Sequence, residues 1–575
     1  MKLSLSEGNE GAKLWIDNEK TVNGVYYADI HMKLAEKAVP KKFVARSYDF
    51  SCVDCFSTWK PNYDDMRCLG ASWAPKRTYS SLASWMPVHT VLSLGGRNRL
   101  TVALSDAFTP TGIKTGVLEE NAQLVIEIVF FTRATVAIEE YHATVRIDTR
   151  DIPYYDSIYD TVEWWEKECG YTPMHVPEHA KLPMNSLWYS YHQRLDVDEI
   201  IRQCRLSKEL GMETVIVDDG WQTDDNSRGY AYCGDWEVAE SKIPDMKQFV
   251  DRVHETGMKI MLWYSVPFVG IHSKAFEHFK TMLLCDDPST VQFAPLDPRY
   301  KEVRDYLIGI YTRAVREWGL DGLKLDFIDS FYLNKKAFAP DDRRDYDSLE
   351  EAVDRLMTDV SRALSEINPE ILIEFRQTYV GPAIRKYGNM LRVSDCPNDA
   401  LRNKAGIIDL RLTSGKTAVH SDMLMWHYND TVETAAMQIV NVLYGVPQIS
   451  VRIDRLNDKH YKMLKYYLSF WRENAKTLMD GKLLAAGPES GYTIACADLD
   501  KKAIFTCYSD TVVEGGEYNE LIAVNGSRSK SLYIRDCGGK SYRVVNCMGE
   551  TLCEGKIDGN LAEIAVPTAG MVFIK

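Results

Sequence analysis

The sequence predicts a multidomain protein with an N-terminal β-sandwich, a central (β/α)8 TIM barrel and a small C-terminal antiparallel β-sandwich. Its 575 residues provide roughly three or four domain lengths. Short alternating segments broken by Gly, Pro, Asn and Asp fill the first 150 residues and return near the C-terminus, which is typical of β domains. Between them, short apolar runs alternate with segments of helical period, and this indicates a parallel sheet covered by helices.

The N-terminal domain is predicted over residues 1–165, with alternating segments at 24–31, 100–105, 123–130 and 134–147. A helix at 157–168 leads to a proline-containing linker at 166–183. The alternation fails between residues 52 and 85, where aromatic residues gather: Phe56, Trp59, Tyr63, Trp73, Tyr79 and Trp85. They are interpreted as a packing cluster under a long loop, or as a surface that stacks on sugar rings or covers the barrel of a neighbouring subunit.

The barrel is predicted over residues 184–482 and the C-terminal domain over 483–575. The eight strand segments are 184–191, 213–219, 259–266, 323–327, 371–377, 390–395, 417–423 and 446–451. Helical periods cover 196–210, 244–256, 300–318, 348–367, 432–444 and 459–473. Asp196 with Glu199, and Ser348 with Glu351, have the spacing of capping boxes.

Composition narrows the range of partners. The net charge of −14 disfavours a nucleic acid or an anionic membrane as the main partner, and a neutral substrate fits better. The first residues lack the apolar core of a secretory signal and no apolar run could span a bilayer, which predicts a cytoplasmic protein. Thirteen cysteines suggest reduced thiols, and Cys52 with Cys55 has no second pair at zinc-finger spacing. Since no nucleotide fingerprint is convincing either, we predict no cofactor and no metal.

The segment 320–331 carries a charged pair on one face of a predicted strand. Lys324 and Asp326 alternate with apolar residues, so their side chains point the same way. Burying two charges in an ordinary core costs several kcal/mol each, and the wall of a polar pocket is the simpler interpretation. An ammonium beside Asp326 would keep it ionised, as a nucleophile must be. A purely structural ion pair is the alternative.

Reactive groups of such barrels lie where the strands end. This rule selects Asp218, Asp219, Trp221, Trp263, Lys324, Asp326, Glu374, Arg376, Arg392, Asp395, His420 and Asp422. Carboxylates and aromatic rings suit a sugar, with its hydroxyls and its apolar ring face. His420 and His427 are more than one helical turn apart, which disfavours a shared zinc ion.

Glycoside hydrolysis requires one ionised and one protonated carboxyl group. If Asp395 lies near Asp326, repulsion and desolvation should raise its pKa and make it the acid. Asp218 and Asp219 can both turn inward at Gly220, although a helix N-cap or a paired metal site would also explain them. Arg376 and Arg392 are either structural partners of these acids or donors to a substrate.

Four ordered motifs resemble glycoside hydrolase family 36, the α-galactosidase family, and its sister family 27. They are Val-Asp-Asp-Gly-Trp at 217–221, Leu-Asp-Pro with Glu-Val-Arg-Asp-Tyr-Leu at 296–307, Leu-Lys-Leu-Asp-Phe at 323–327 and Arg-Val-Ser-Asp at 392–395. The resemblance implies Asp326 as nucleophile and Asp395 as acid/base, with retention of configuration. It further implies that Asp218, Asp219 and Lys324 bind galactose hydroxyls. Trp263 would line the pocket, and Trp221 belongs to the same motif.

The sequence departs from family 36 after the fifth strand. Many members have Cys-Ser-Gly-Gly-Gly where this chain has Ile-Glu-Phe-Arg-Gln-Thr-Tyr-Val-Gly at 373–381, and Arg392 resembles family 27. In that sister family a Glu and an Arg hold the 2-hydroxyl, which implies this role for Glu374 and Arg392. The expected function is a retaining exo-α-galactosidase for small glycosides. An α-N-acetylgalactosaminidase, an α-glucosidase, a transglycosylase and a non-catalytic sugar-binding protein stay open, as does a homo-oligomer.

Overall fold

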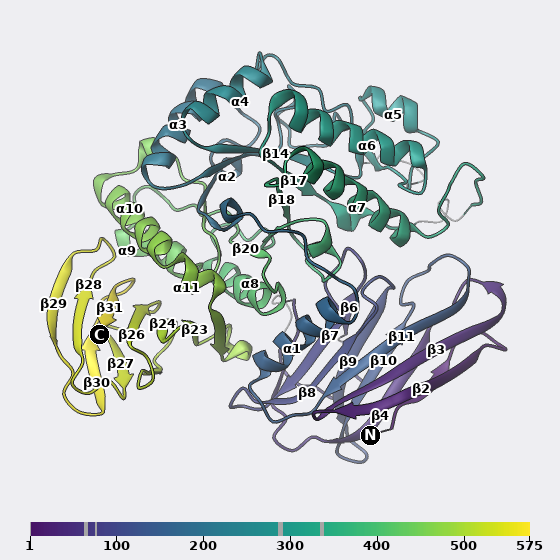
Figure 1. Ribbon diagram of the computed structural model, residues 1–575, viewed down its shortest axis with the longest axis horizontal. Coiled ribbons are helices and arrows are strands. Elements are labelled where there is room, and N and C mark those ends of the chain that lie inside the picture. The colour runs from purple at the N-terminus through teal and green to yellow at the C-terminus, as the bar shows by residue number, and fades with distance from the viewer. Residues whose placement is uncertain (1, 63–66, 75–76, 286–290, 334–338) are drawn as a thin grey trace.

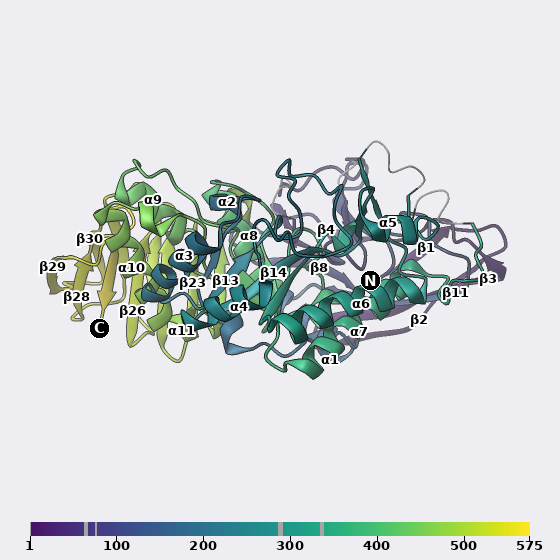
Figure 2. The same cartoon turned by 90° about the horizontal axis from the view of Figure 1, so that it is seen from above.

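The computed structural model describes residues 2–62, 67–74, 77–285, 291–333 and 339–575. The three predicted parts are present: the barrel, with the N-terminal sandwich and the C-terminal β domain on one side of it (Figure 1). Both outer domains also lie apart along the long axis when the molecule is viewed from above (Figure 2). No helix in the described part of the chain has the length and apolarity that a membrane span requires.

The N-terminal domain consists of two antiparallel sheets. One contains β1 (Ser4–Glu7), β4 (Phe43–Ser51), β10 (Gln123–Phe130), β9 (Thr111–Leu118) and β6 (Thr78–Ser80) in that order. The other contains β2 (Lys13–Val22), β3 (Val25–Ala38), β11 (Ile138–Asp148), β8 (Asn98–Leu104), β7 (Val88–Leu92) and β5 (Ser57–Trp59). Alternate residues of β3, such as Ala28 and Ile30, are fully buried in the core between the sheets. The predicted sandwich is confirmed.

Helix α1 (Tyr154–Lys167) connects this domain to the barrel. It begins three residues before the predicted start, and Trp165 on its buried face donates to the carbonyl oxygen of Leu104 at 2.8 Å. The buried face of α1 belongs to one apolar cluster with residues of the sandwich and of the barrel. Apolar contacts, as well as the chain itself, therefore join the N-terminal domain to the barrel.

Eight parallel strands form the barrel. They are β12 (Met184–Ser186), β13 (Thr214–Val217), β14 (Lys259–Ser265), β17 (Gly322–Asp326), β18 (Leu372–Phe375), β19 (Met390–Arg392), β20 (Ala418–His420) and β21 (Gln448–Ile449). A parallel bridge between His420 and Val446 brings the last strand against β20 and nearly closes the sheet. Seven of these strands fall within predicted segments and β17 begins one residue before its segment, so the barrel prediction is confirmed.

The covering helices follow the predicted periodicity. They are α3 (Val197–Glu209), α4 (Met246–Glu255), α6 (Lys301–Arg313), α7 (Leu349–Ile367), α9 (Val432–Val440) and α10 (Asp458–Glu473). Asp196 accepts a hydrogen bond from the backbone N of Glu199 at 2.9 Å, and Ser348 accepts one from Glu351 at 3.2 Å. Both predicted N-caps are therefore present.

Helix α8 (Ala400–Thr413) was not predicted. It has no apolar stripe because it is buried on almost every side, between the barrel and the two outer domains. Its Asp409 accepts hydrogen bonds from Trp59 and Arg67 of the N-terminal domain and from Tyr492 of the C-terminal domain. This buried polar cluster, called the domain junction below, joins all three parts.

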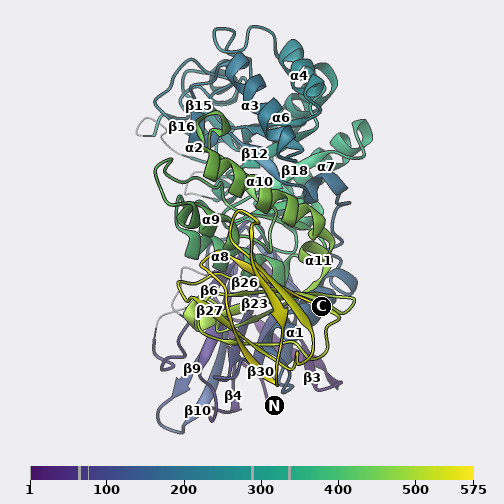
Figure 3. The same cartoon turned by 90° about the vertical axis from the view of Figure 1, so that its left-hand side faces the viewer.

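The C-terminal domain contains a seven-stranded and a three-stranded sheet, and in Figure 3 it lies below α9 and α10, in front of the N-terminal domain. The larger sheet has β22 (Lys482–Ala486), β23 (Ile494–Leu499), β24 (Lys502–Cys507), β26 (Glu520–Asn525), β31 (Met571–Ile574), β28 (Ser541–Val545) and β29 (Thr551–Lys556). The smaller has β25 (Val512–Glu514), β27 (Ser531–Arg535) and β30 (Leu561–Ala565). Most neighbours are antiparallel as predicted, but β24 with β26 and β25 with β27 are parallel pairs.

Candidate active site

One arginine joins the two predicted catalytic aspartates at the mouth of the barrel. Asp326 ends β17, Asp395 follows β19, and Arg376 follows β18, the strand between them. Nε of Arg376 lies 2.8 Å from Oδ2 of Asp326, and its Nη1 lies 2.8 Å from Oδ2 of Asp395. The barrel therefore places both carboxylates on one rim, separated by the width of a single guanidinium group.

Asp326 is almost fully buried and is held by four donors. Its Oδ2 accepts from Nε1 of Trp263 at 2.7 Å and from Arg376. Its Oδ1 accepts from the backbone N of Phe327 at 2.8 Å and from the hydroxyl of Tyr379. Burial by itself would raise the pKa of Asp326, but the charges of Arg376 and then Lys324 outweigh it and lower the pKa below its usual value. The carboxylate is ionised, and its direct cationic partner is Arg376 rather than Lys324.

The prediction of a raised pKa for Asp395 is wrong. Oδ1 of this half-exposed side chain accepts from Nη2 of Arg392 at 2.8 Å, while Oδ2 accepts from Arg376. Burial would raise the pKa of Asp395, but Arg392 and Arg376 hold it well below its usual range. The sequence-based argument considered only repulsion by Asp326 and did not foresee two guanidinium groups around one carboxylate.

The two aspartates after β13 both turn inward. Gly220 makes this possible with a φ of 112°, and a Cβ atom there would lie 2.6 Å from the Cα of Gln193. Oδ2 of Asp218 accepts from Nζ of Lys324 at 2.5 Å, so an ammonium group balances this carboxylate. Neither aspartate caps a helix, since the next described helix begins at Met246.

Asp219 is buried among neutral donors. Its oxygens accept from the side-chain amides of Gln193 at 2.7 Å and Gln222 at 2.6 Å. Burial, with a contribution from the charge of Asp218, raises the pKa of Asp219 to about 6. Its environment thus differs sharply from that of Asp218, although the two residues are adjacent.

Glu374 and Arg392 form the fully buried floor of the site. Nε of Arg392 and Oε1 of Glu374 lie 3.8 Å apart, and neither atom has a hydrogen-bond partner in the described structure. The other groups of these side chains are occupied: Arg392 donates to Asp422, and Glu374 accepts from Gln448. Burial raises the pKa of Glu374. An unpaired donor beside an unpaired acceptor is a site that one hydroxyl group can satisfy.

The predicted tryptophans occupy different positions. Trp263 contacts Asp326 directly and packs against Tyr230, with ring centroids 6.1 Å apart. Trp221 is completely buried, and its Nε1 donates to the backbone oxygen of Trp263 at 2.9 Å. Since Trp236 also packs against both tryptophans, Trp221 lies in a layer of aromatic rings that supports Trp263.

Several residues of the mouth were missed from the sequence. Tyr379 contacts Asp326, Gln193 contacts Asp219, and Gln448 contacts Glu374. Gln193 and Tyr379 each come two residues after a predicted strand segment, so extending the strand-end rule by two positions would have found them. The same rule would not have found Gln448, because this residue lies inside a predicted apolar strand rather than after its end.

The last two predicted site residues, Asp422 and His420, are buried and hydrogen-bonded within the protein. Asp422 is buried and accepts from the hydroxyl of Tyr189 at 2.9 Å and from Arg392. His420 is fully buried, with Nε2 2.7 Å from the carbonyl oxygen of Ala180, and burial lowers the pKa of His420 to about 3. This histidine is neutral at ordinary pH and is held by backbone.

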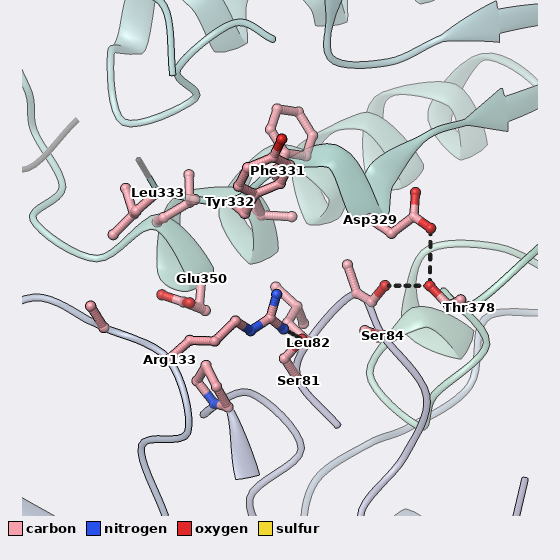
Figure 4. Close-up of a pocket in the computed structure, with 15 residues that line it drawn as sticks. Ser81, Leu82, Ser84, Arg133, Asp329, Phe331, Tyr332, Leu333, Glu350 and Thr378 are labelled. Atoms are coloured by element: carbon pink, nitrogen blue, oxygen red, sulfur yellow. Dashed lines mark hydrogen bonds between the residues drawn. The ribbon is translucent and has the colours of Figure 1, made fainter. Parts of the chain in front are cut away.

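A cavity of about 490 Å³ lies beside the mouth, between the N-terminal domain and the chain after β17 (Figure 4). Its lining includes Arg133, Asp329, Glu350 and Thr378. Thr378 donates to Asp329 at 3.0 Å, and its carbonyl oxygen accepts from the backbone N of Trp85 at 2.6 Å. The sandwich thus contacts the barrel of its own chain next to the candidate site.

The other aromatic residues between 52 and 85 are dispersed. Trp59 is fully buried at the domain junction, whereas Phe56, Trp73 and Tyr79 are exposed. Tyr63 lies outside the described residues. These residues therefore do not form one packing cluster: Trp59 contacts Asp409 of α8, and the segment next to Trp85 contacts the chain after β18.

Residues 179–383 match the family model for melibiase. Over 152 residues the chain is 32% identical to the α-galactosidase Mel36A of Lactobacillus acidophilus, a stretch that covers 24% of this chain and 19% of that one. Over 147 residues it is 35% identical to the bifunctional α-galactosidase/sucrose kinase AgaSK of Mediterraneibacter gnavus, covering 24% and 15%. The matched stretch thus spans about a fifth of the length of Mel36A.

Solved structures match over much more of the chain. The galactosidase domain of AgaSK superimposes with a TM-score of 0.64 at 13% identity, covering 96% of this chain and 78% of that one. The family 36 α-galactosidase AgaA of Geobacillus stearothermophilus, in complex with raffinose, gives 0.64 at 14% identity, covering 96% and 79%. The predicted resemblance to family 36 α-galactosidases is confirmed.

Proposed function

We propose that this relative of the family 36 α-galactosidases is a glycoside hydrolase that removes a terminal α-linked galactose from small glycosides or oligosaccharides. The observation that carries the proposal is the pair of Asp326 and Asp395 on one rim, joined through Arg376. Asp326 is buried and Asp395 is half-exposed, which suits a nucleophile inside the pocket and a proton donor near the leaving group.

The proposed reaction is a double displacement. Asp326 attacks the anomeric carbon and forms a covalent glycosyl intermediate, while Asp395 protonates the oxygen of the leaving group. Asp395 then takes a proton from the water that hydrolyses the intermediate. Two inversions at one carbon retain the α-configuration. The hydrogen bonds from Trp263 and Tyr379 fix the direction in which the Asp326 carboxylate points.

Arg376 has to move for this reaction to occur. Its guanidinium group lies between the two carboxylates, where the anomeric carbon of a substrate would be bound. Displacement removes one of the three cations that lower the pKa of Asp395, so substrate binding itself favours protonation of the acid. Before displacement, Arg376 also contacts Gln377, whose amide oxygen lies 2.7 Å from Nη1.

The remaining polar groups fit the hydroxyls of a galactose ring. Asp218 and Asp219, with Lys324 beside them, supply acceptors and a donor on one side of the mouth for the 3-, 4- and 6-hydroxyls. The unpaired atoms of Glu374 and Arg392 suit the 2-hydroxyl. Since this floor is fully buried, a bulky acetamido group would fit it poorly, which favours galactose over N-acetylgalactosamine.

A panel of nitrophenyl α-glycosides tests the proposal. We expect turnover of the α-galactoside in preference to the N-acetylgalactosaminide and the glucoside, and loss of at least about a thousandfold in kcat in Asp326→Ala. Nuclear magnetic resonance of the first product should show the α-anomer. If no α-glycoside is cleaved while sugars still bind, the protein is a sugar-binding protein instead.

A further inference from the structure

Two histidines and two aspartates gather on the outer face of the six-stranded sheet, far along the chain from the barrel residues. In β3, Ala28 and Ile30 point into the core, so Asp29 and His31 point outward. His31 is paired across the sheet with His142 of β11, and Asp29 is paired with Asp17 of β2. Strands β2, β3 and β11 are neighbours at the right of Figure 1. The register therefore brings four potential metal-binding side chains together.

The spacing of these groups suits one metal ion. Asp29, His31 and His142 each place a ligand atom within 4.8 Å of the other two. Nε2 of His142 is 3.6 Å from Oδ1 of Asp29. Ligand atoms on a tetrahedral zinc ion are about 3.3 Å apart, because each bond is about 2.0 to 2.1 Å long. The half-exposed His142 side chain can rotate to close the remaining gap.

Neighbouring residues hold two of the three ligands in place. Nε2 of His31 lies 2.9 Å from Oδ1 of Asp17, and a carboxylate that orients a histidine in this way is a regular feature of metal sites. Thr144 donates to Oδ1 of Asp29 at 2.6 Å, and Asn18 donates to its Oδ2 at 2.8 Å. These hydrogen bonds fix the direction in which the Asp29 carboxylate points.

We propose that Asp29, His31 and His142 bind a divalent transition metal ion of the zinc type, with Asp17 orienting His31. Two imidazoles and a carboxylate are a borderline donor set that favours Zn²⁺ over Ca²⁺ or Mg²⁺, and the two carboxylates balance the charge of a dication. Three protein ligands leave a fourth position for water. The ion links β3 to β11 and stabilises the sandwich when bound. It shares no residue with the barrel mouth and does not depend on the proposed hydrolase activity.

Calorimetric titration of the chelator-treated, full-length protein with Zn²⁺ alone tests the site. We expect one equivalent to bind, with at least about tenfold weaker affinity in His142→Ala and about tenfold weaker affinity in Asp17→Asn. His175→Ala is the matched control, because His175 is an exposed histidine paired with a carboxylate, Glu370, elsewhere in the molecule. Its affinity should equal that of the unmodified protein.

A second measurement separates metal binding from misfolding. Co²⁺ should give the strong visible absorption of a four-coordinate site in the unmodified protein and in His175→Ala, but not in His142→Ala. Since His142 is half-exposed, its removal should leave the circular dichroism spectrum unchanged. The proposal is overturned if the unmodified protein binds no Zn²⁺, or if a folded His142→Ala variant binds it with the same stoichiometry and affinity.

Discussion

Arg376 contacts Asp326 through two nitrogens that meet a single oxygen, with Nε and Nη2 at 2.8 and 2.7 Å from Oδ2. Its third nitrogen, Nη1, is bonded to Asp395. Arg376 therefore helps to lower the pKa of both carboxyl groups on which the proposed chemistry depends. The first prediction follows from this relationship.

Replacing Arg376 with Ala should shift the pH dependence of kcat/KM toward higher pH. The pKa values of Asp326 and Asp395 are both lowered with the help of this cation, so both should rise when it is removed. The acidic limb, where Asp326 must be ionised, and the basic limb, where Asp395 must be protonated, should move in the same direction.

The profile is measured on nitrophenyl α-galactoside, with Arg205→Ala on the exposed side of α3 as the control. A profile that keeps both limbs while KM rises would show that Arg376 binds the substrate rather than sets the two pKa values.

Removing the carboxyl group of Asp395 should affect substrates according to their leaving groups. A proton donor contributes roughly 10² to 10⁴ in rate when the departing oxygen is strongly basic. We expect Asp395→Ala to lose a factor in this range on an oligosaccharide such as raffinose and much less on dinitrophenyl α-galactoside, whose leaving group needs no proton. Equal losses on both substrates would contradict the assignment of Asp395 as the acid.

Asp219 should make the protein less stable as pH rises from about 4 to about 6. Its pKa is raised to about 6 in the folded protein, so folding favours the protonated form, and this contribution is lost as pH rises through that value. The side chain in Asp219→Asn cannot ionise. Between pH 4 and pH 7 the variant should therefore lose less free energy of unfolding than the unmodified protein, by up to roughly 2 to 3 kcal/mol.

Thermal unfolding midpoints at the two pH values provide the comparison, with the exposed Asp198→Asn as control. If the unmodified protein and Asp219→Asn show the same pH dependence, folding does not raise the pKa of Asp219.

The domain junction should contribute strongly to stability. Asp409 is buried with Arg67, and Asp409→Ala leaves a guanidinium group without its counter-charge, which costs about 3 to 5 kcal/mol. Asp198→Ala, which removes the exposed partner of Arg252, should cost less than about 1 kcal/mol. A midpoint in Asp409→Ala that equals the control would show that the junction is dispensable. Replacing Arg67 and Asp409 together by apolar residues should recover part of the loss.

Periodicity made most of the secondary structure accessible from the sequence. All eight barrel strands overlap predicted segments, and the caps at Asp196 and Ser348 were identified from four-residue patterns. Helix α8 was missed, because a helix buried on almost every side carries no apolar stripe. The short helices α2 (Trp188–Tyr191), α5 (Lys274–Phe279) and α11 (Ala475–Asp480) were missed as well. The strand-end rule also found Asp326, Asp395 and Arg376, but it could not indicate that the third lies between the first two.

The sequence by itself determined which segments form strands and helices, and therefore which side chains stand at the mouth of the barrel, because the alternation of buried and exposed residues is a local property. Only the tertiary structure decided the charge state of Asp395 and the contacts of Arg376. A pKa depends on every charge and donor within a few ångströms, and around Asp395 these come from different strands of the barrel. The same reason applies to Asp29, His31 and His142, which are brought together by the register of β3 and β11.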